Sequence, residues 1–242
     1  MSTNDISENK EVEGFRQTLA EVPKAEELFD DNFDTFISCA YDNDLLDKFP
    51  ALGWLMGLAK GTQETYNEFI RYRFCKKAYK FLFFTKDIDR DKLNDFFREY
   101  SKASGEDGYE LLLSVIDRVD NLVKVKYLAN LLKAKLEGKI SIDDYIRLNT
   151  ALQLVPFIDL KTLPSYTESR KEGKDTYSLF ASGLLVMSNI DPKGTNSYQL
   201  SENGLLLAKY GMEKDVSKYK KGNTSISGMV TYEKVDDLNE SL

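Results

Sequence analysis

Apolar residues recur at intervals of three or four positions from Tyr109 to Glu137. This spacing is that of one face of an α-helix, so it predicts a single long helix over 109–137, with Gly138 as its C-terminal stop. The residues at these intervals are Leu112, Val115, Val119, Leu122, Val125, Ala129, Leu132 and Leu136, and the face is widened by Leu111, Ile116, Val123, Leu128 and Leu131. A face this wide favours burial in a core over a narrow seam between two copies. We therefore expect a mainly α protein, with a homo-oligomer through 109–137 as the alternative.

A second helical unit is predicted to begin at Ser141. Asp144 follows three residues later, close to the pattern of a capping box. The helix should end near Val155, because Pro156 disfavours helical geometry in the residue before it. Two short helices are expected next, in 157–166 and 174–185. In the second of them we expect four residues to turn inward, namely Leu179, Phe180, Gly183 and Leu184.

A β-hairpin and a final helix are predicted after these helices. The segments LLVMSNI and NSYQL have the composition of strands, and Pro192 and Gly194 between them suit a turn. Ser201 is placed to cap the last helix, with Glu202 near the positive end of the helix dipole.

The order helix, helix, helix, hairpin, helix is accompanied by two short motifs. L-x-x-x-GLL precedes the hairpin and Y-x-LSENG-x-x-LA follows it. Together they resemble the winged helix-turn-helix superfamily, and the resemblance implies a winged-helix domain over 139–212. A helical domain is expected over 13–138, and it is similar to uncharacterised bacterial or phage proteins. The polar ends, 1–12 and 213–242, are expected to be a mobile tail and a mostly disordered acidic tail.

DNA-binding winged helices insert their third helix into the major groove, so the resemblance marks the region around 170–193 as a contact surface. The candidate contacts to nucleic acid or to a partner are Arg170, Lys171, Lys174, Tyr177, Ser178, Ser182 and Lys193. The third helix itself carries no Lys or Arg, and residues 145–222 hold only 11 Lys and Arg against 8 Asp and Glu in a chain of net charge −7. Phosphate neutralisation dominates affinity for duplex DNA. We therefore expect an adaptor or regulatory protein that binds a protein partner, and the alternative is a DNA-binding transcriptional regulator with a helical partner-binding or dimerisation domain.

The chain contains no histidine. This excludes Ser-His-Asp and Cys-His catalysis and removes the commonest metal ligand. The two cysteines, Cys39 and Cys75, have no ligand-like spacing and are expected to be buried thiols. We expect a non-enzymatic protein without a cofactor or metal.

Three alternating acids, Asp87, Asp89 and Asp91, superficially match the first ligands of an EF-hand. Lys92 stands where that loop needs glycine, and Arg98 where it needs a bidentate glutamate. We expect these acids to cap a helix running to Tyr100 instead.

The N-terminal part contains further helical patterns. Apolar spacing over 15–41, interrupted at Pro23, predicts two short helices. The segment 49–60 suits core packing better than a membrane interface, because Lys48 and Lys60 are its only cations.

A helix is also predicted over 64–85, with apolar and basic residues on separate stripes. The basic stripe consists of Arg73, Lys76, Lys77 and Lys80. We interpret it as a solvated face, in preference to a nucleic-acid track, because Glu64 and Glu68 lie nearby.

The first residues lack both the basic region and the apolar region of a signal peptide. The longest apolar run, 49–59, is about half the length that a spanning helix needs. We expect a cytoplasmic protein without a transmembrane segment.

Overall fold

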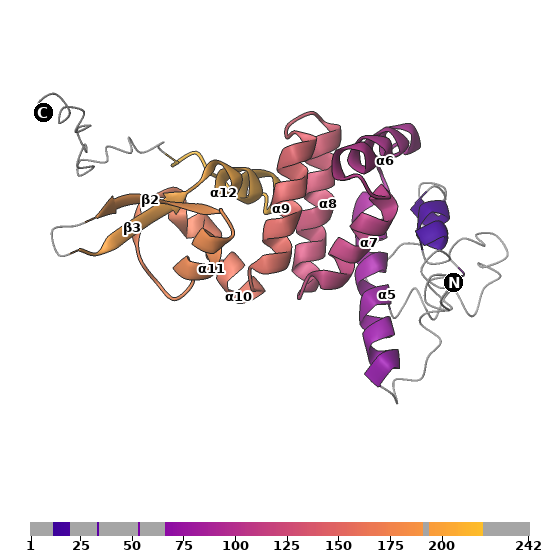
Figure 1. The fold of residues 1–242 in the computed structure, drawn as a ribbon, viewed down its shortest axis with the longest axis horizontal. Coiled ribbons are helices and arrows are strands. Elements are labelled where there is room, and N and C mark those ends of the chain that lie inside the picture. Colours follow the sequence, from indigo (N-terminus) through magenta and orange to yellow (C-terminus); the bar gives the residue numbers. More distant parts are fainter. Residues whose placement is uncertain (1–11, 20–32, 34–52, 54–65, 191–193, 220–242) are drawn as a thin grey trace, which may run out of the picture.

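A computed structural model gives the fold and describes residues 12–19, 33, 53, 66–190 and 194–219. These residues form a mainly helical molecule with one small three-stranded antiparallel sheet. Helices fill most of its length, and a hairpin projects at one end (Figure 1).

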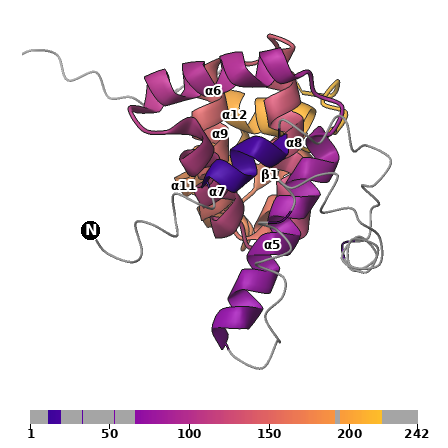
Figure 2. The same cartoon turned by 90° about the vertical axis from the view of Figure 1, so that its right-hand side faces the viewer.

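Five helices form the body of the molecule: α5 (Tyr66–Thr85), α6 (Arg90–Ser104), α7 (Gly108–Arg118), α8 (Leu122–Leu136) and α9 (Ile142–Leu154). A short helix over 12–19 lies against this body (Figure 2). Its Phe15 ring is 6.3 Å from the Phe81 ring, and Arg16 pairs with Asp107 at 3.0 Å. The helix expected in this region is confirmed, and the rest of 15–41 lies outside the described residues apart from Phe33.

Two predicted helix starts are confirmed by their caps. The Asp89 carboxylate accepts hydrogen bonds from the backbone N–H groups of Asp91 and Lys92 at the start of α6. At the start of α9, the Ser141 hydroxyl accepts from the Asp144 N–H while the Asp144 carboxylate accepts from the Ser141 N–H. The sequence pattern therefore sets these two boundaries locally.

The prediction of one continuous helix over 109–137 is wrong. Helix α7 ends at Arg118, Val119 is extended (ψ 135°), and the Asn121 side chain caps α8 by accepting from the Val123 N–H. The break lets both helices turn their apolar faces into one core. The expected burial of this face is confirmed, since five of its residues are fully buried: Leu112, Val119, Val125, Ala129 and Leu132. The alternative, a homo-oligomer through 109–137, stays a prediction.

A buried lysine ties α8 to the end of α9. Lys124 is fully buried, pairs with Asp120 at 2.6 Å and donates to the carbonyl oxygens of Leu152 (2.8 Å) and Val155. Asp120 also accepts from the Phe157 N–H at 3.0 Å. Burial raises the pKa of Asp120, but the bonds from Lys124 and Phe157 outweigh it and hold that pKa below its usual value.

The expected solvated basic stripe on α5 is wrong at Lys77. This side chain is buried and donates to the Asp117 carbonyl oxygen of α7. Burial lowers its pKa. Nearby Cys75 is buried as predicted, and burial raises the pKa of its thiol to about 12.

The C-terminal module follows α9 and contains all three strands of the described residues. Its elements are α10 (Phe157–Leu160), the 3-10 helix η4 (Leu163–Thr167), β1 (Arg170–Lys171), α11 (Thr176–Ala181), β2 (Leu185–Ile190), β3 (Asn196–Leu200), α12 (Glu202–Leu206) and the π-helical η5 (Leu207–Gly211). The single helix predicted over 157–166 is instead the pair α10 and η4, with Pro164 in the first turn of η4.

The predicted hairpin is confirmed. Strands β2 and β3 pair antiparallel, and Gly194 between them has φ +77°. Ser201 caps α12 as predicted, accepting from the Gly204 N–H at 3.0 Å. Strand β1 was not predicted; it pairs with β3, so the order in the sheet is β1-β3-β2.

The helical body and the module share one apolar core. Within the body, the Tyr145 ring of α9 meets Phe96 at 5.1 Å and Tyr100 at 5.6 Å, both in α6. Between the module and the body, η5 packs on α8, and the Asn130 side chain donates to the Gly211 carbonyl at 2.9 Å. The division into domains at 139 stays a prediction.

Residues 213–219 also contact this body, although the C-terminal tail was expected from 213. Glu213 pairs with Lys126 at 2.9 Å, and the Tyr219 hydroxyl donates to the Leu200 carbonyl at 3.3 Å. Residues 1–11 and 220–242, Cys39 and nearly all of 49–60 lie outside the described residues, as do the predictions made for them. Within the described part of the chain, every helix is too short or too polar to cross a bilayer.

Candidate functional site

Helix α11 is held on the module by a polar network in the loop before it. The Thr176 hydroxyl accepts from the Gly173 N–H at 2.7 Å and shares a 2.9 Å hydrogen bond with the buried Tyr166 hydroxyl. Leu179 fills the core beneath. Although α11 has only six residues, its orientation is therefore fixed at its first turn.

The Asp175 carboxylate lies at the centre of this network. It accepts from the Thr162 hydroxyl at 2.5 Å and pairs with the Arg170 guanidinium at 3.3 Å. Burial raises the pKa of Asp175, but the bond from Thr162 and the charge of Arg170 outweigh it, so that this pKa lies below its usual value.

Arg170, a predicted contact residue, is engaged within the module. Besides its pair with Asp175, it donates to the Ser165 hydroxyl at 2.7 Å and lies 4.8 Å from the centre of the Tyr166 ring. A guanidinium held on three sides has little freedom to clamp a phosphate.

The predicted contact hydroxyls are also used internally. Ser178 donates to the Asp159 carboxylate at 2.7 Å, and Ser182 donates to the Leu179 carbonyl at 2.9 Å. Their protons are directed into the module, so neither hydroxyl can donate to a base edge unless these bonds break.

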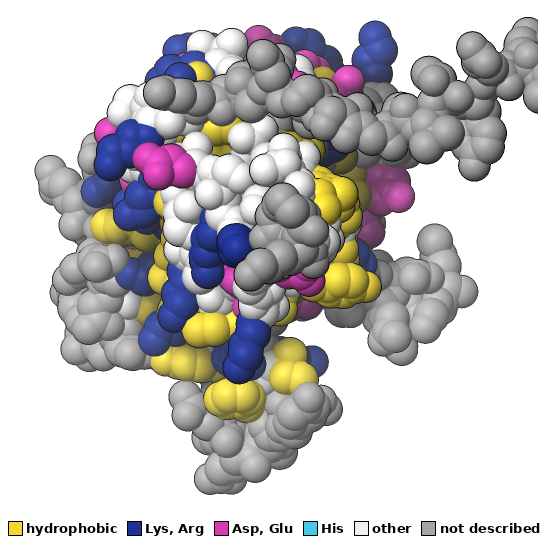
Figure 3. Space-filling view, turned by 90° about the vertical axis from the view of Figure 1, so that its left-hand side faces the viewer, with side chains coloured by type: hydrophobic (Ala, Val, Ile, Leu, Met, Phe, Trp, Pro, Cys, Tyr) yellow, Lys and Arg dark blue, Asp and Glu magenta, His cyan; other side chains and the backbone are white. Residues whose placement is uncertain are grey.

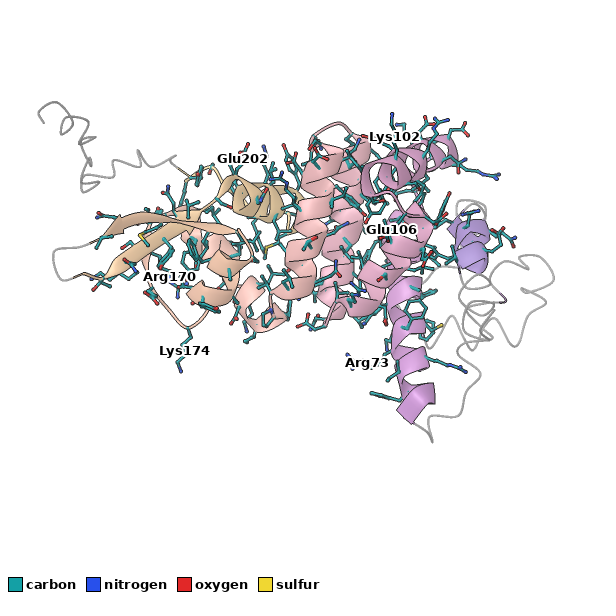
Figure 4. The ribbon with its side chains drawn as sticks, in the orientation of Figure 1. Arg73, Lys102, Glu106, Arg170, Lys174 and Glu202 are labelled. Atoms are coloured by element: carbon teal, nitrogen blue, oxygen red, sulfur yellow. The ribbon has the colours of Figure 1, made fainter. Side chains whose placement is uncertain are left out.

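The remaining predicted cations are Lys171, Lys174 and Lys193. Lys171 and Lys174 are exposed, and the Lys174 side chain projects away from the ribbon (Figure 4). Lys193 lies outside the described residues.

Apolar side chains dominate the outer side of α11. Tyr177 is 81% exposed and Phe180 is 45% exposed, with the Phe180 ring edge-on to Tyr198 at 5.4 Å. Ile158, 61% exposed, lies beside Asp159, which the Ser178 bond brings to α11. We call Ile158, Tyr177 and Phe180 the α11 surface. On the face of the module in Figure 3, hydrophobic side chains gather at the right, and others lie at the lower left among Lys and Arg.

Two members of the α11 surface were not recognised from the sequence. Phe180 was expected to turn inward with Leu179 and Leu184, which are both buried, but it is half-exposed. Six residues make less than two turns, too few for a periodic pattern to reveal which side faces out. Ile158 was not singled out, because α10 has only four residues and is likewise too short for a periodic pattern.

A cleft lies away from the module. It has a volume of about 680 Å³ and opens between the 12–19 helix, α5 and α7. Its walls combine apolar side chains with charges of both signs, with Arg71 and Arg118 set among Glu106, Glu110 and Asp117. The part of the chain that the structure describes contains no cluster of three acidic or cysteine side chains that could hold a metal ion.

No protein-family model, no curated protein and no solved structure matches this chain. Its function must therefore be inferred from its own residues.

Proposed function

We propose that α9 and the C-terminal module together, residues 139–212, form a winged-helix domain that binds a protein, and that the chain is a non-enzymatic cytoplasmic adaptor or regulatory protein. The observation that carries this proposal is the exposed, apolar α11 surface, of which Tyr177 is the most exposed member. Contiguous exposed apolar side chains on a folded protein commonly mark a protein contact.

The composition of the α11 surface suits a protein partner. Tyr177 offers a rigid ring with a polar tip, the kind of side chain that supplies much of the binding energy at interfaces. Phe180 is braced by Tyr198, and α11 is fixed by Thr176 and Asp175. A surface that is already ordered loses little conformational entropy on binding.

The same surface is poorly suited to duplex DNA. Helix α11 carries no Lys or Arg, and Arg170 is paired with Asp175. The exposed Lys171 and Lys174 are few against the six to ten phosphate contacts of typical tight binders, and the chain carries −7 overall.

A DNA titration tests the proposal. The full chain is titrated against a fluorescent duplex of random sequence at low and at moderate salt, with anisotropy as the signal. We expect no saturable binding at either salt. Tight binding that weakens steeply with salt would contradict the proposal, because such a slope reports phosphate contacts.

The alternative is a DNA-binding regulator, favoured by the exposed Lys171 and Lys174 beside α11. If the chain binds duplex DNA, Lys174→Glu should lower the affinity and Glu172→Lys should raise it, since both positions are exposed on the loop before α11. That pair of opposite shifts would establish the alternative.

A non-enzymatic role is supported by the lack of histidine in the chain. In the cleft between α5 and α7, the acids lie among arginines, and no described lining residue forms a nucleophile and base pair that acyl or phosphoryl transfer would use.

A further inference from the structure

The sheet of the module has two edges of opposite character. At one edge, β1 has only two residues, and both are cationic, Arg170 and Lys171. At the other edge, β2 has six residues, LVMSNI, without a charge, a proline or a glycine. Short strands and charged side chains are the usual protection of an edge against pairing with another chain. The edge at β1 has that protection, and the edge at β2 lacks it apart from one irregularity in its register between Met187 and Asn189.

Strand β2 also exposes apolar side chains. Val186 is 38% exposed, Met187 is 37% exposed and Ile190 is 58% exposed. Within the described residues, the hydrogen-bonding groups on the outer side of β2 face no further strand. The hairpin lies at the end of the molecule opposite α5, with α11 packed on β2 (Figure 1). A second chain could therefore approach the outer edge of β2 without meeting α5–α9.

From these observations we propose that the chain forms a homodimer in which β2 pairs antiparallel with β2 of a second copy. A two-fold axis brings a strand against itself, so the strand must be compatible with itself. An uncharged strand meets this condition even on a chain of net charge −7, because no like charges face each other across the pair. The dimer joins two three-stranded sheets into one six-stranded sheet. It goes beyond the α11 proposal and does not depend on it.

Sedimentation equilibrium of the full chain over a range of micromolar concentrations tests the dimer. We expect a reversible monomer–dimer equilibrium. Val186→Lys should raise the dissociation constant by about tenfold or more, because each edge would then carry a lysine, and a charged side chain on an edge strand opposes pairing with another chain. The matched control is Val123→Lys, since Val123 of α8 is exposed to a similar extent, 41%. The control should leave the dissociation constant unchanged, and circular dichroism of both variants verifies folding.

Hydrogen exchange locates the contact independently of any substitution. At high protein concentration the amides of Leu185–Ile190 should exchange more slowly than at low concentration, while those of α11 should not change. A chain that stays monomeric throughout the range overturns the proposal. A dimer that survives Val186→Lys but is lost in Tyr177→Ala also overturns it, since the contact would then lie on the α11 surface.

Discussion

Two lysines illustrate how individual side chains secure this fold. Lys77 and Lys124 are both buried, and both donate to backbone carbonyl oxygens of a neighbouring helix or its end. Their partners lie 40 and 28 residues away in sequence. Lys124 also has a local partner, Asp120, but the carbonyl oxygens that satisfy both ammonium groups come from contacts that no local pattern contains.

Replacing Lys124 by methionine tests this role. The substitution keeps the apolar stem but leaves the carbonyls of Leu152 and Val155 without their donor, so we expect a loss of about 2–4 kcal/mol in the free energy of unfolding. The control is Lys126→Met, whose ion pair with Glu213 is about half exposed on both sides and should contribute below about 1 kcal/mol. Urea unfolding measures both. Equal effects of the two substitutions would refute a special role for Lys124.

Asp175 should make the module sensitive to acid. Its pKa in the folded chain lies below the ordinary value of 3.8, so its contribution to stability is present above that value and is lost as the pH falls through the folded pKa. At neutral pH, Asp175→Asn should therefore unfold at a lower urea midpoint than the parent chain. The difference between the two midpoints should become smaller as the pH falls towards 3.

Urea midpoints at several pH values provide the measurement. Glu172→Gln removes an exposed carboxylate three residues earlier and is the control. A constant difference between Asp175→Asn and the parent across the pH range would show that Asp175 stabilises the module by hydrogen bonding alone.

At the scale of elements, the sequence predicted the helix starts and the turn that short-range interactions determine. The caps at Asp89, Ser141 and Ser201 and the turn at Gly194 act over three or four residues, and each was readable from the sequence. The break at Asn121 was missed because the apolar spacing continues across it. The cap that Asn121 gives to α8 is as local as the others, so this signal was present in the sequence.

Elements that depend on distant pairing were not predicted. Strand β1 has two residues and exists only because Tyr198 and Ser197 of β3 lie opposite it. The candidate site was predicted only in part for the same reason. Tyr177 was named as a contact residue and is exposed. The internal hydrogen bonds of Arg170, Ser178 and Ser182 were not predicted, because they depend on how the module folds.

The glycine of the LSENG motif, Gly204, has a steric reason. A Cβ atom at this position would lie 2.0 Å from the backbone carbonyl oxygen of Leu184, so only glycine lets α12 approach the hairpin this closely. Gly204→Ala should lower the free energy of unfolding by about 2 kcal/mol or more, because the backbone must shift. Glu202→Ala, exposed on the same helix, should cost about 0.5 kcal/mol. Thermal unfolding distinguishes them, and similar losses would mean that the close approach is not required.

At the scale of the whole molecule, the residues that hold the fold together and the residues proposed to bind a partner lie in different places. The helical body and the module share one apolar core. Helix α11 and strand β2 are packed on this core at one end of the molecule. The charged Asp175 is buried in the polar network at the start of α11, whereas the apolar Tyr177 and Phe180 of α11 are exposed. This distribution favours a protein partner over a phosphate backbone.

Site-specific photo-crosslinking in cells tests this most directly. A photoreactive amino acid replaces Tyr177 in the full chain, and a second variant carries it at Lys102, an exposed position of α6. We predict that position 177 gives a discrete protein crosslink that resists nuclease, that Phe180→Asp abolishes it, and that position 102 does not give it. A nuclease-sensitive crosslink from position 177, or the same crosslink from both positions, would contradict protein binding by the α11 surface.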